Sequence, residues 1–129
     1  MVIDDQRLNA ISERIIGCAF AVSNVLGVGF LEKVYENALV HELRKAGLAV
    51  AQQHGMTVRY DGVVVGEYVA DILVEQSVLV ELKHARGIDD VYLAQCLNYL
   101  RAANLPLCLL IDFGKPRVEV RRIALRNAL

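Results

Sequence analysis

Apolar residues recur at steps of three and four along the N-terminal part of the chain, which is the spacing of one helix face. This pattern predicts a helix from about Asp5 to Leu26, where Gly27 and Gly29 interrupt it. A second helical period runs from Leu31 to Leu43, and Gly47 follows as a typical C-cap residue. The sequence therefore predicts two helices in its first third.

Short runs rich in β-branched residues replace the helical pattern after Leu48. Asp61-Gly62 lies between two of these runs and is a strong signal for a tight hairpin turn. A short connection around Glu75–Ser77 separates the two later runs, which should therefore pair as antiparallel neighbours. The expected strands are Thr57–Tyr60, Val63–Val65, Tyr68–Val74 and Val78–Lys83.

A third helix is expected from Asp89 or Asp90, either of which can cap its N-terminus, to about Ala103. Asn104 and Pro106 then end it. Two strands should follow, the first apolar as a strand buried on both faces would be, the second alternating apolar and charged residues. Their ranges are Leu107–Phe113 and about Arg117–Ile123.

Together these elements predict the α/β class, with a small mixed β-sheet flanked by helices and two helices at the N-terminus. The chain has 129 residues, enough for one core and too few for two, so residues 1–129 are expected to form a single domain. Hydrophobic residues make up 55% of the chain, a slightly high share that favours a homo-oligomer in which copies bury apolar surface.

No apolar run approaches the roughly 20 residues of a transmembrane helix, so no association with a membrane is expected. The N-terminus carries Asp4 and Asp5 where a secretory signal would carry basic residues, which predicts a cytoplasmic protein. Cys18, Cys96 and Cys108 are odd in number and widely spaced, so we interpret all three as buried thiols.

The net charge of −1 gives the chain no general attraction to nucleic acid. Residues 115–129, however, hold five basic residues against one acidic residue, a net charge of +4. The basic residues are Lys115, Arg117, Arg121, Arg122 and Arg126, and the acid is Glu119. This segment is either a solvated edge strand with protective charges or a phosphate-contacting patch in which Arg121 and Arg122 bind substrate.

Three charged residues on neighbouring strands are the main candidates for chemistry. Glu81 and Lys83 alternate with apolar residues, so they point to the same face of their strand. The short connection would set Asp71 opposite Glu81 and bring two carboxylates together. Such a pair needs a cation or a proton to offset its charge, and its oxygens suit Mg²⁺ or Mn²⁺. The alternative is an ion pair between Asp71 and Lys83, with Glu81 in solvent.

Asp71 followed after nine residues by Glu81-Leu82-Lys83 has the form D…(D/E)XK, and Gly29–Tyr35 reads G-x-x-E-x-x-Y. Further motifs are the A-Q-x-x-N-Y-L helix at Ala94–Leu100 and the closing strands at Asp112–Gly114 and Arg121–Ile123. In this order they resemble the GxxExxY branch of the PD-(D/E)XK nuclease superfamily. The likeness spans about residues 8–123 and implies a restriction-endonuclease-like core.

The resemblance implies that Asp71 and Glu81 bind a divalent metal ion, Mg²⁺ or Mn²⁺, with the Leu82 carbonyl as a further candidate ligand. That ion would activate water and neutralise charge on a phosphodiester. Lys83 would position the nucleophile or stabilise the developing negative charge. Glu32 would reach the metal ion directly or through water, the alternative being a solvated acid in the first turn of a helix.

Gln95 and Tyr99 are four residues apart on one helix face and match the Q-x-x-x-Y pair of related nucleases. They would orient the catalytic lysine or touch substrate, although Tyr99 is also suited to the core. Tyr35 is expected to pack with its hydroxyl satisfied. Two positions depart from the family pattern. Ala70 stands in place of proline, and Asp112 in place of asparagine, where it would either add negative charge near the sheet or point to solvent.

These features favour a metal-dependent nuclease that hydrolyses DNA or RNA by in-line attack of a metal-activated water. The rival hypothesis is a catalytically silent nuclease fold that acts as a self-assembling structural or interaction module. The near-neutral charge and the apolar composition support this rival.

Overall fold

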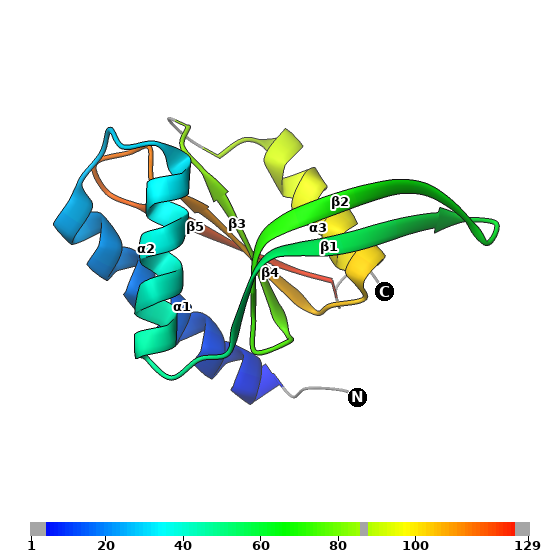
Figure 1. The fold of residues 1–129 in the computed structure, drawn as a ribbon, viewed down its shortest axis with the longest axis horizontal. Helices are drawn as coiled ribbons and strands as arrows, with labels where there is room; N and C mark the ends of the chain where they lie inside the picture. Colours follow the sequence, from blue (N-terminus) through cyan, green and yellow to red (C-terminus); the bar gives the residue numbers. More distant parts are fainter. Residues whose placement is uncertain (1–4, 86–87, 126–129) are drawn as a thin grey trace.

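The computed structural model describes residues 5–85 and 88–125 of the chain. In this part the helices are α1 (Asp5–Leu26), α2 (Glu32–Lys45) and α3 (Asp90–Ala103), and the strands are β1 (Val50–Tyr60), β2 (Val63–Val74), β3 (Val78–Lys83), β4 (Leu107–Asp112) and β5 (Glu119–Ala124). Figure 1 shows their arrangement. No helix of the described segments has the length and apolar character needed to cross a membrane.

The strands form one sheet in the order β1-β2-β3-β4-β5. β3 and β4 are parallel, with α3 as the crossover between them, and the other neighbours are antiparallel. Helices α1 and α2 cover one face of the sheet and α3 covers the other (Figure 1). The predicted α/β fold, a mixed sheet flanked by helices, is confirmed.

A hydrophobic core lies on each face of the sheet. The larger core, beneath α1 and α2, includes Ile15 and Leu39, and the smaller core, beneath α3, includes Leu79 and Leu100. All of β4 is buried, since its side chains alternate between the two cores. This double burial explains why the strand reads as a continuous apolar run.

The ends of α3 follow from its capping residues. The Asp89 carboxylate accepts hydrogen bonds from the backbone N–H groups of Val91 and Tyr92, at 3.0 and 3.3 Å, and so satisfies two donors that have no partner in the helix. Asn104 ends the helix in the left-handed conformation, with φ of 54°. Both predicted boundaries of this helix are therefore confirmed.

Three sequence-based predictions were wrong in detail. β2 is one continuous strand, whereas Gly66 and Glu67 were expected to interrupt it; Gly66 pairs with Val58 and keeps the ladder intact. β1 begins at Val50, well before the predicted start, because β2 is long enough to pair with all of it. Cys18 is only half-buried, unlike Cys96 and Cys108.

The sheet has a long extension on one side. β2 pairs with β3 only from Ile72 to Val74, but it pairs with β1 along nearly its whole length. Residues 54–70 therefore form a two-stranded hairpin, here named the β-arm, that projects beyond the other strands (Figure 1). The point where β2 leaves β3 is occupied by Asp71, which gives the candidate site its position.

Candidate active site

Asp71 and Glu81 lie where the ladder between β2 and β3 stops. The last paired residues are Ile72 and Val80. At the next position of each strand, the carboxylates of Asp71 and Glu81 accept hydrogen bonds from backbone N–H groups of the neighbouring strand, in place of backbone carbonyls. Glu81 Oε1 accepts a hydrogen bond from the Asp71 N–H at 2.9 Å, and Asp71 Oδ2 accepts one from the Leu82 N–H at 2.8 Å. The predicted juxtaposition of the two acids is thus found, and each acid is fixed by the other's strand.

The two acids share a poorly hydrated space. Glu81 is 6% exposed, and burial followed by the negative charge of Asp71 raises the pKa of Glu81 to about 8. Burial also raises the pKa of Asp71 above its usual range, although the hydrogen bond from the Leu82 N–H opposes this shift. The alternative with Glu81 in solvent is therefore wrong. Without a compensating cation, the pair favours taking up a proton near neutral pH.

Lys83 lies beside this pair without forming an ion pair with either acid in the described part of the chain. Its ammonium lies over the ring of Tyr92, 4.7 Å from the ring centroid, and its positive charge opposes the rise in the pKa of both acids. Glu81 and Lys83 pair with alternate residues of β4, so they point to the same face, as predicted. The alternative of an ion pair between Asp71 and Lys83 is therefore wrong, and Lys83 stays available to another anion.

Glu32 approaches the acids from the other side, at the first turn of α2. The residue is exposed, yet partial burial of its carboxyl group and then the charge of Asp71 raise the pKa of Glu32, while Lys83 lowers it. Glu32 therefore lies within electrostatic reach of both residues, and a third carboxylate belongs to the same neighbourhood. Its interaction with a metal ion stays a prediction.

Glu36, one turn further along α2, was not indicated as a site residue by the sequence. It is 3% exposed and accepts hydrogen bonds from Lys33, Gln52 and Gln53. Burial alone would raise the pKa of Glu36, but these hydrogen bonds outweigh burial and lower it. The cluster ties α2 to β1 directly beside Asp71, and its charge contributes to the raised pKa of Asp71.

Tyr35, the last residue of the G-x-x-E-x-x-Y motif, holds the start of α2 in place. Its hydroxyl donates a hydrogen bond to the Gly27 carbonyl at 2.6 Å and accepts one from the Phe30 N–H at 3.3 Å. Its ring stacks on Phe113 and on His84, with centroids 4.9 and 5.5 Å apart. The prediction that Tyr35 packs with a satisfied hydroxyl is confirmed. The motif therefore fixes the loop that presents Glu32.

Replacing Tyr35 by phenylalanine should lower the free energy of unfolding by about 1–3 kcal/mol, because the Phe30 N–H and the Gly27 carbonyl lose their partner. Urea titration would measure the change. Tyr60→Phe is the matched control, since Tyr60 is 76% exposed at the end of the β-arm and should tolerate the change. Equal losses in the two variants would contradict the role given to the Tyr35 hydroxyl.

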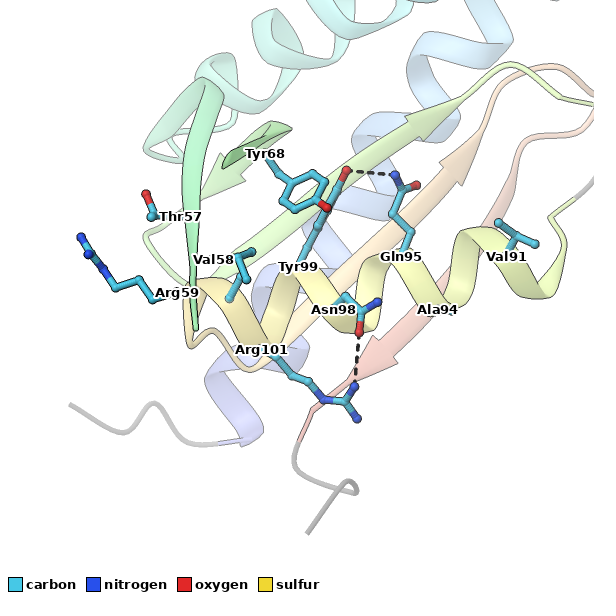
Figure 2. A pocket seen from close by; sticks show the side chains of 11 residues that line it. Thr57, Val58, Arg59, Tyr68, Val91, Ala94, Gln95, Asn98, Tyr99 and Arg101 are labelled. Atoms are coloured by element: carbon cyan, nitrogen blue, oxygen red, sulfur yellow. Dashed lines mark hydrogen bonds between the residues drawn. The ribbon is translucent and has the colours of Figure 1, made fainter. Parts of the chain in front are cut away.

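Gln95 and Tyr99 meet on the face of α3 that lies toward the site. The Gln95 amide donates a hydrogen bond to the Tyr99 hydroxyl at 3.0 Å, drawn in Figure 2. Burial first, and then the charge of Glu81, raises the pKa of Tyr99. Tyr92 was missed as a neighbour of the site. Its spacing of three residues from Gln95 places both on one helix face and was the available signal.

Arg121 and Arg122 lie on β5, the edge strand of the sheet, and both are exposed. Arg121 pairs with Leu110, which belongs to the α3-side core, whereas Arg122 pairs with Leu109 of the opposite core. Paired residues point to the same face, so the two arginines point to opposite faces and only Arg121 shares a face with Glu81. Their binding to substrate stays a prediction, and Arg126 lies outside the described residues.

Of the two alternatives for Asp112, the one in which it points to solvent is wrong, because the residue is buried at the end of β4. It is 0% exposed, and its Oδ1 accepts hydrogen bonds from the backbone N–H groups of Ala85 and Gly114, at 3.1 and 2.8 Å. Its Oδ2 is buried without a partner in the described structure. The backbones of Gly114 and Ala85 are so close that a Cβ at position 114 would collide with Ala85. Asp112 therefore joins the segments that follow β3 and β4.

The acid pair has the chemistry of a site for a divalent cation. Asp71 and Glu81 each use one oxygen for a backbone N–H, and their other oxygens have no hydrogen-bond partner among the described residues. Within residues 5–85 and 88–125, no three His, Cys, Asp or Glu side chains are close enough to hold one ion together. Two carboxylates that each keep one oxygen without a hydrogen bond suit a hard cation such as Mg²⁺, which keeps several of its water ligands when it binds to a protein.

A mixed sheet that brings two acids and a lysine together at the splayed end of neighbouring strands defines a nuclease-like class of site. Residues 9–123 match the PD-(D/E)XK nuclease superfamily. The chain therefore belongs to this superfamily, and the match covers every element except the start of α1 and the end of β5. A comparison with curated proteins found no match.

Two solved structures are similar to this chain. The first, an alkaline exonuclease (LHK-Exo) from Laribacter hongkongensis, has a TM-score of 0.55 at 16% identity, over 99% of this chain and 74% of the exonuclease. The second, SSO0001, has a TM-score of 0.57 at 19% identity, over 92% of this chain and 61% of SSO0001. At such low identity these likenesses support the fold.

Proposed function

We propose that the protein is a metal-dependent nuclease of the GxxExxY branch that hydrolyses phosphodiester bonds in DNA or RNA. The observation that carries this proposal is the pair of carboxylates, Asp71 and Glu81, that face each other in a poorly hydrated space beside Lys83. A silent structural module would gain nothing from two adjacent like charges, which oppose folding unless a cation or proton offsets them. The Gly29–Tyr35 motif supports the branch.

In this proposal Asp71 and Glu81 would hold Mg²⁺ or Mn²⁺ through the oxygens that accept no backbone hydrogen bond. Such an ion, when bound, lowers the pKa of a water molecule and neutralises charge on the phosphate. Lys83 forms no ion pair with a carboxylate of the described residues, and it would stabilise the negative charge that develops on the phosphodiester. Glu32 would orient water at the same place, and Gln95 would position Tyr99, whose hydroxyl it already contacts.

The direct test is incubation of the purified protein with Mg²⁺ or Mn²⁺ and with labelled single- and double-stranded DNA and RNA. We expect cleavage that EDTA abolishes and that Lys83→Ala lowers by on the order of 10²–10³-fold, the usual effect of removing one transition-state contact. Lys45→Ala is the matched control, because Lys45 lies at the far end of α2 and is exposed. Equal cleavage by wild type and Lys83→Ala would refute the proposed site.

Self-assembly is a separate prediction that does not depend on catalysis. The β-arm carries several exposed apolar side chains, and a second copy would shield them from water. These side chains are Tyr60, Val63, Val64, Val65 and Val69. Light scattering measures the mass in solution directly, and a strict monomer would remove this prediction without touching the nuclease proposal.

A further inference from the structure

A long groove runs between the β-arm and α3, next to the candidate active site. Its volume is about 1030 Å³, at the upper end of the range of ligand sites. Figure 2 shows the groove from close by, with the arm on one side and the helix on the other. The residues that line it include Arg59 and Tyr68 of the arm and Gln95, Asn98, Tyr99 and Arg101 of α3.

The lining of the groove is positively charged. It contains Arg59 and Arg101 and no acidic residue, although the chain as a whole carries a net charge of −1. Arg59 is exposed and lies beside a register shift between β1 and β2. Figure 2 shows its side chain on the side of β1 that faces away from α3, opposite to Val58. Arg101 is exposed on α3 and donates a hydrogen bond to Asn98 Oδ1 at 3.3 Å. Arg101 is therefore the cation that borders the groove, on its helix wall.

An aromatic ring forms part of the groove surface. Tyr68 is 48% exposed, and its ring centroid lies 5.5 Å from that of Tyr99 at an interplanar angle of 45°. Tyr99 is 7% exposed, so it supports Tyr68 from the core side and leaves much of the Tyr68 ring open. A supported, half-exposed ring is a suitable surface on which a nucleobase can stack.

The groove continues into the candidate active site through Gln95 and Tyr99. Both residues line the groove, and their side chains are hydrogen-bonded to each other at 3.0 Å. Tyr99 packs in the core beneath α3, and Glu81 pairs with Leu110 of the same core, so Glu81 points to the face of the sheet on which Tyr99 lies. Lys83 reaches the same helix, with its ammonium 4.7 Å from the centroid of the Tyr92 ring. A chain bound along the groove would therefore lie on the same face of the sheet as Glu81 and Lys83.

We infer that this groove binds single-stranded nucleic acid next to the phosphate to be cleaved, with a base stacked on Tyr68 and a phosphate contacted by Arg101. The inference rests on the proposed nuclease function for the position of the cleaved phosphate. A single strand is favoured over a duplex because the bases of a duplex stack on one another and leave no free face for Tyr68. The combination of an aromatic surface with a neighbouring cation is typical of binding without sequence preference.

Binding can be measured separately from cleavage, by fluorescence anisotropy of a labelled oligothymidylate in EDTA. Tyr68→Ala should weaken binding by at least about five-fold, because loss of base stacking has effects of that size or larger. Tyr68→Phe keeps the ring and should bind as the wild type does. Tyr60→Ala is the matched control, since Tyr60 lies on the same arm, is 76% exposed and does not line the groove.

Arg101 has its own readout, which is the dependence of affinity on salt. Arg101→Ala should reduce the slope of log affinity against log salt by about 0.7, the contribution of one phosphate contact on a single strand. Arg44→Ala serves as the control, because Arg44 is exposed on α2, on the opposite face of the sheet. Its slope should match that of the wild type.

The inference is overturned if Tyr68→Ala binds the oligonucleotide as the wild type does, or if blunt duplex competes as well as the single strand. It is also overturned if Tyr68→Ala changes only the mass in solution, because the groove would then take a second copy of the chain. The nuclease proposal can fail separately. If the variants bind the oligonucleotide as expected but no metal-dependent cleavage is found, only the proposed catalysis is wrong. Conversely, if cleavage needs Lys83 but needs neither Tyr68 nor Arg101, only the inference about the groove is wrong.

Discussion

Asp71→Asn should lower metal-dependent cleavage by on the order of 10³-fold while leaving the fold intact. The asparagine oxygen can still accept the Leu82 N–H, which now donates to Asp71 Oδ2 at 2.8 Å, so the junction between β2 and β3 is kept. What is lost is one negative charge of the pair that would hold the metal ion. A neutral amide ligates Mg²⁺ or Mn²⁺ more weakly than a carboxylate, so both the affinity for metal and the rate should fall.

Glu67→Gln is the matched control for this variant. Glu67 is also an acid of β2, but it is exposed on the β-arm and belongs to no cluster described above. Titration calorimetry with Mn²⁺ adds a readout that does not need turnover, and it should show weaker binding for Asp71→Asn alone. If Asp71→Asn cleaves and binds Mn²⁺ as the control does, Asp71 is not a ligand and the proposed metal site is wrong.

The sequence was sufficient to predict most of the fold because its patterns are local. The steps of three and four in α1, the Asp89 cap of α3 and the apolar run of β4 each depend on residues near in sequence. The meeting of Asp71 and Glu81 was also predictable. A three-residue connection between antiparallel strands fixes the register, and the register fixes which residues face each other.

What could not be predicted depends on partners that are distant in sequence. Gly66 favours a break by itself, but pairing with Val58 across the arm keeps β2 continuous. Asp112 is polar, yet the backbone N–H groups of Ala85 and Gly114 satisfy one of its oxygens inside the core.

The separation of Arg121 and Arg122 was open to prediction in part. Neighbouring residues of a strand point to opposite faces, so the pair could not share one face of β5. Which of the two lies on the face of Glu81 depends on the register between β4 and β5, and that register is set by contacts across the sheet. The groove beside α3 had no local signal either, because it exists only where the β-arm passes the helix.

The stability of the metal-free protein should fall as the pH rises, and Glu81 should be the main cause. Its pKa is raised from an ordinary value of 4.5 to about 8 in the folded state, by burial first and by Asp71 second. The folded protein therefore holds a proton that the unfolded chain has already released. The contribution is fully present below pH 4.5 and is lost between about pH 4.5 and 8, a change of a few kcal/mol.

Urea titrations in EDTA at several pH values would measure this loss, and Glu81→Gln should remove most of it. Glutamine keeps an oxygen for the Asp71 N–H and carries no charge, so the variant should be more stable than the wild type at pH 8. Mn²⁺ should stabilise the wild type more at high pH than at low pH, since proton and ion compete for the same oxygens. If the free energy of unfolding depends on pH in the same way for the wild type and for Glu81→Gln in EDTA, this prediction is wrong. Water would then already compensate the charges of Asp71 and Glu81, and a cation would have no excess charge to neutralise.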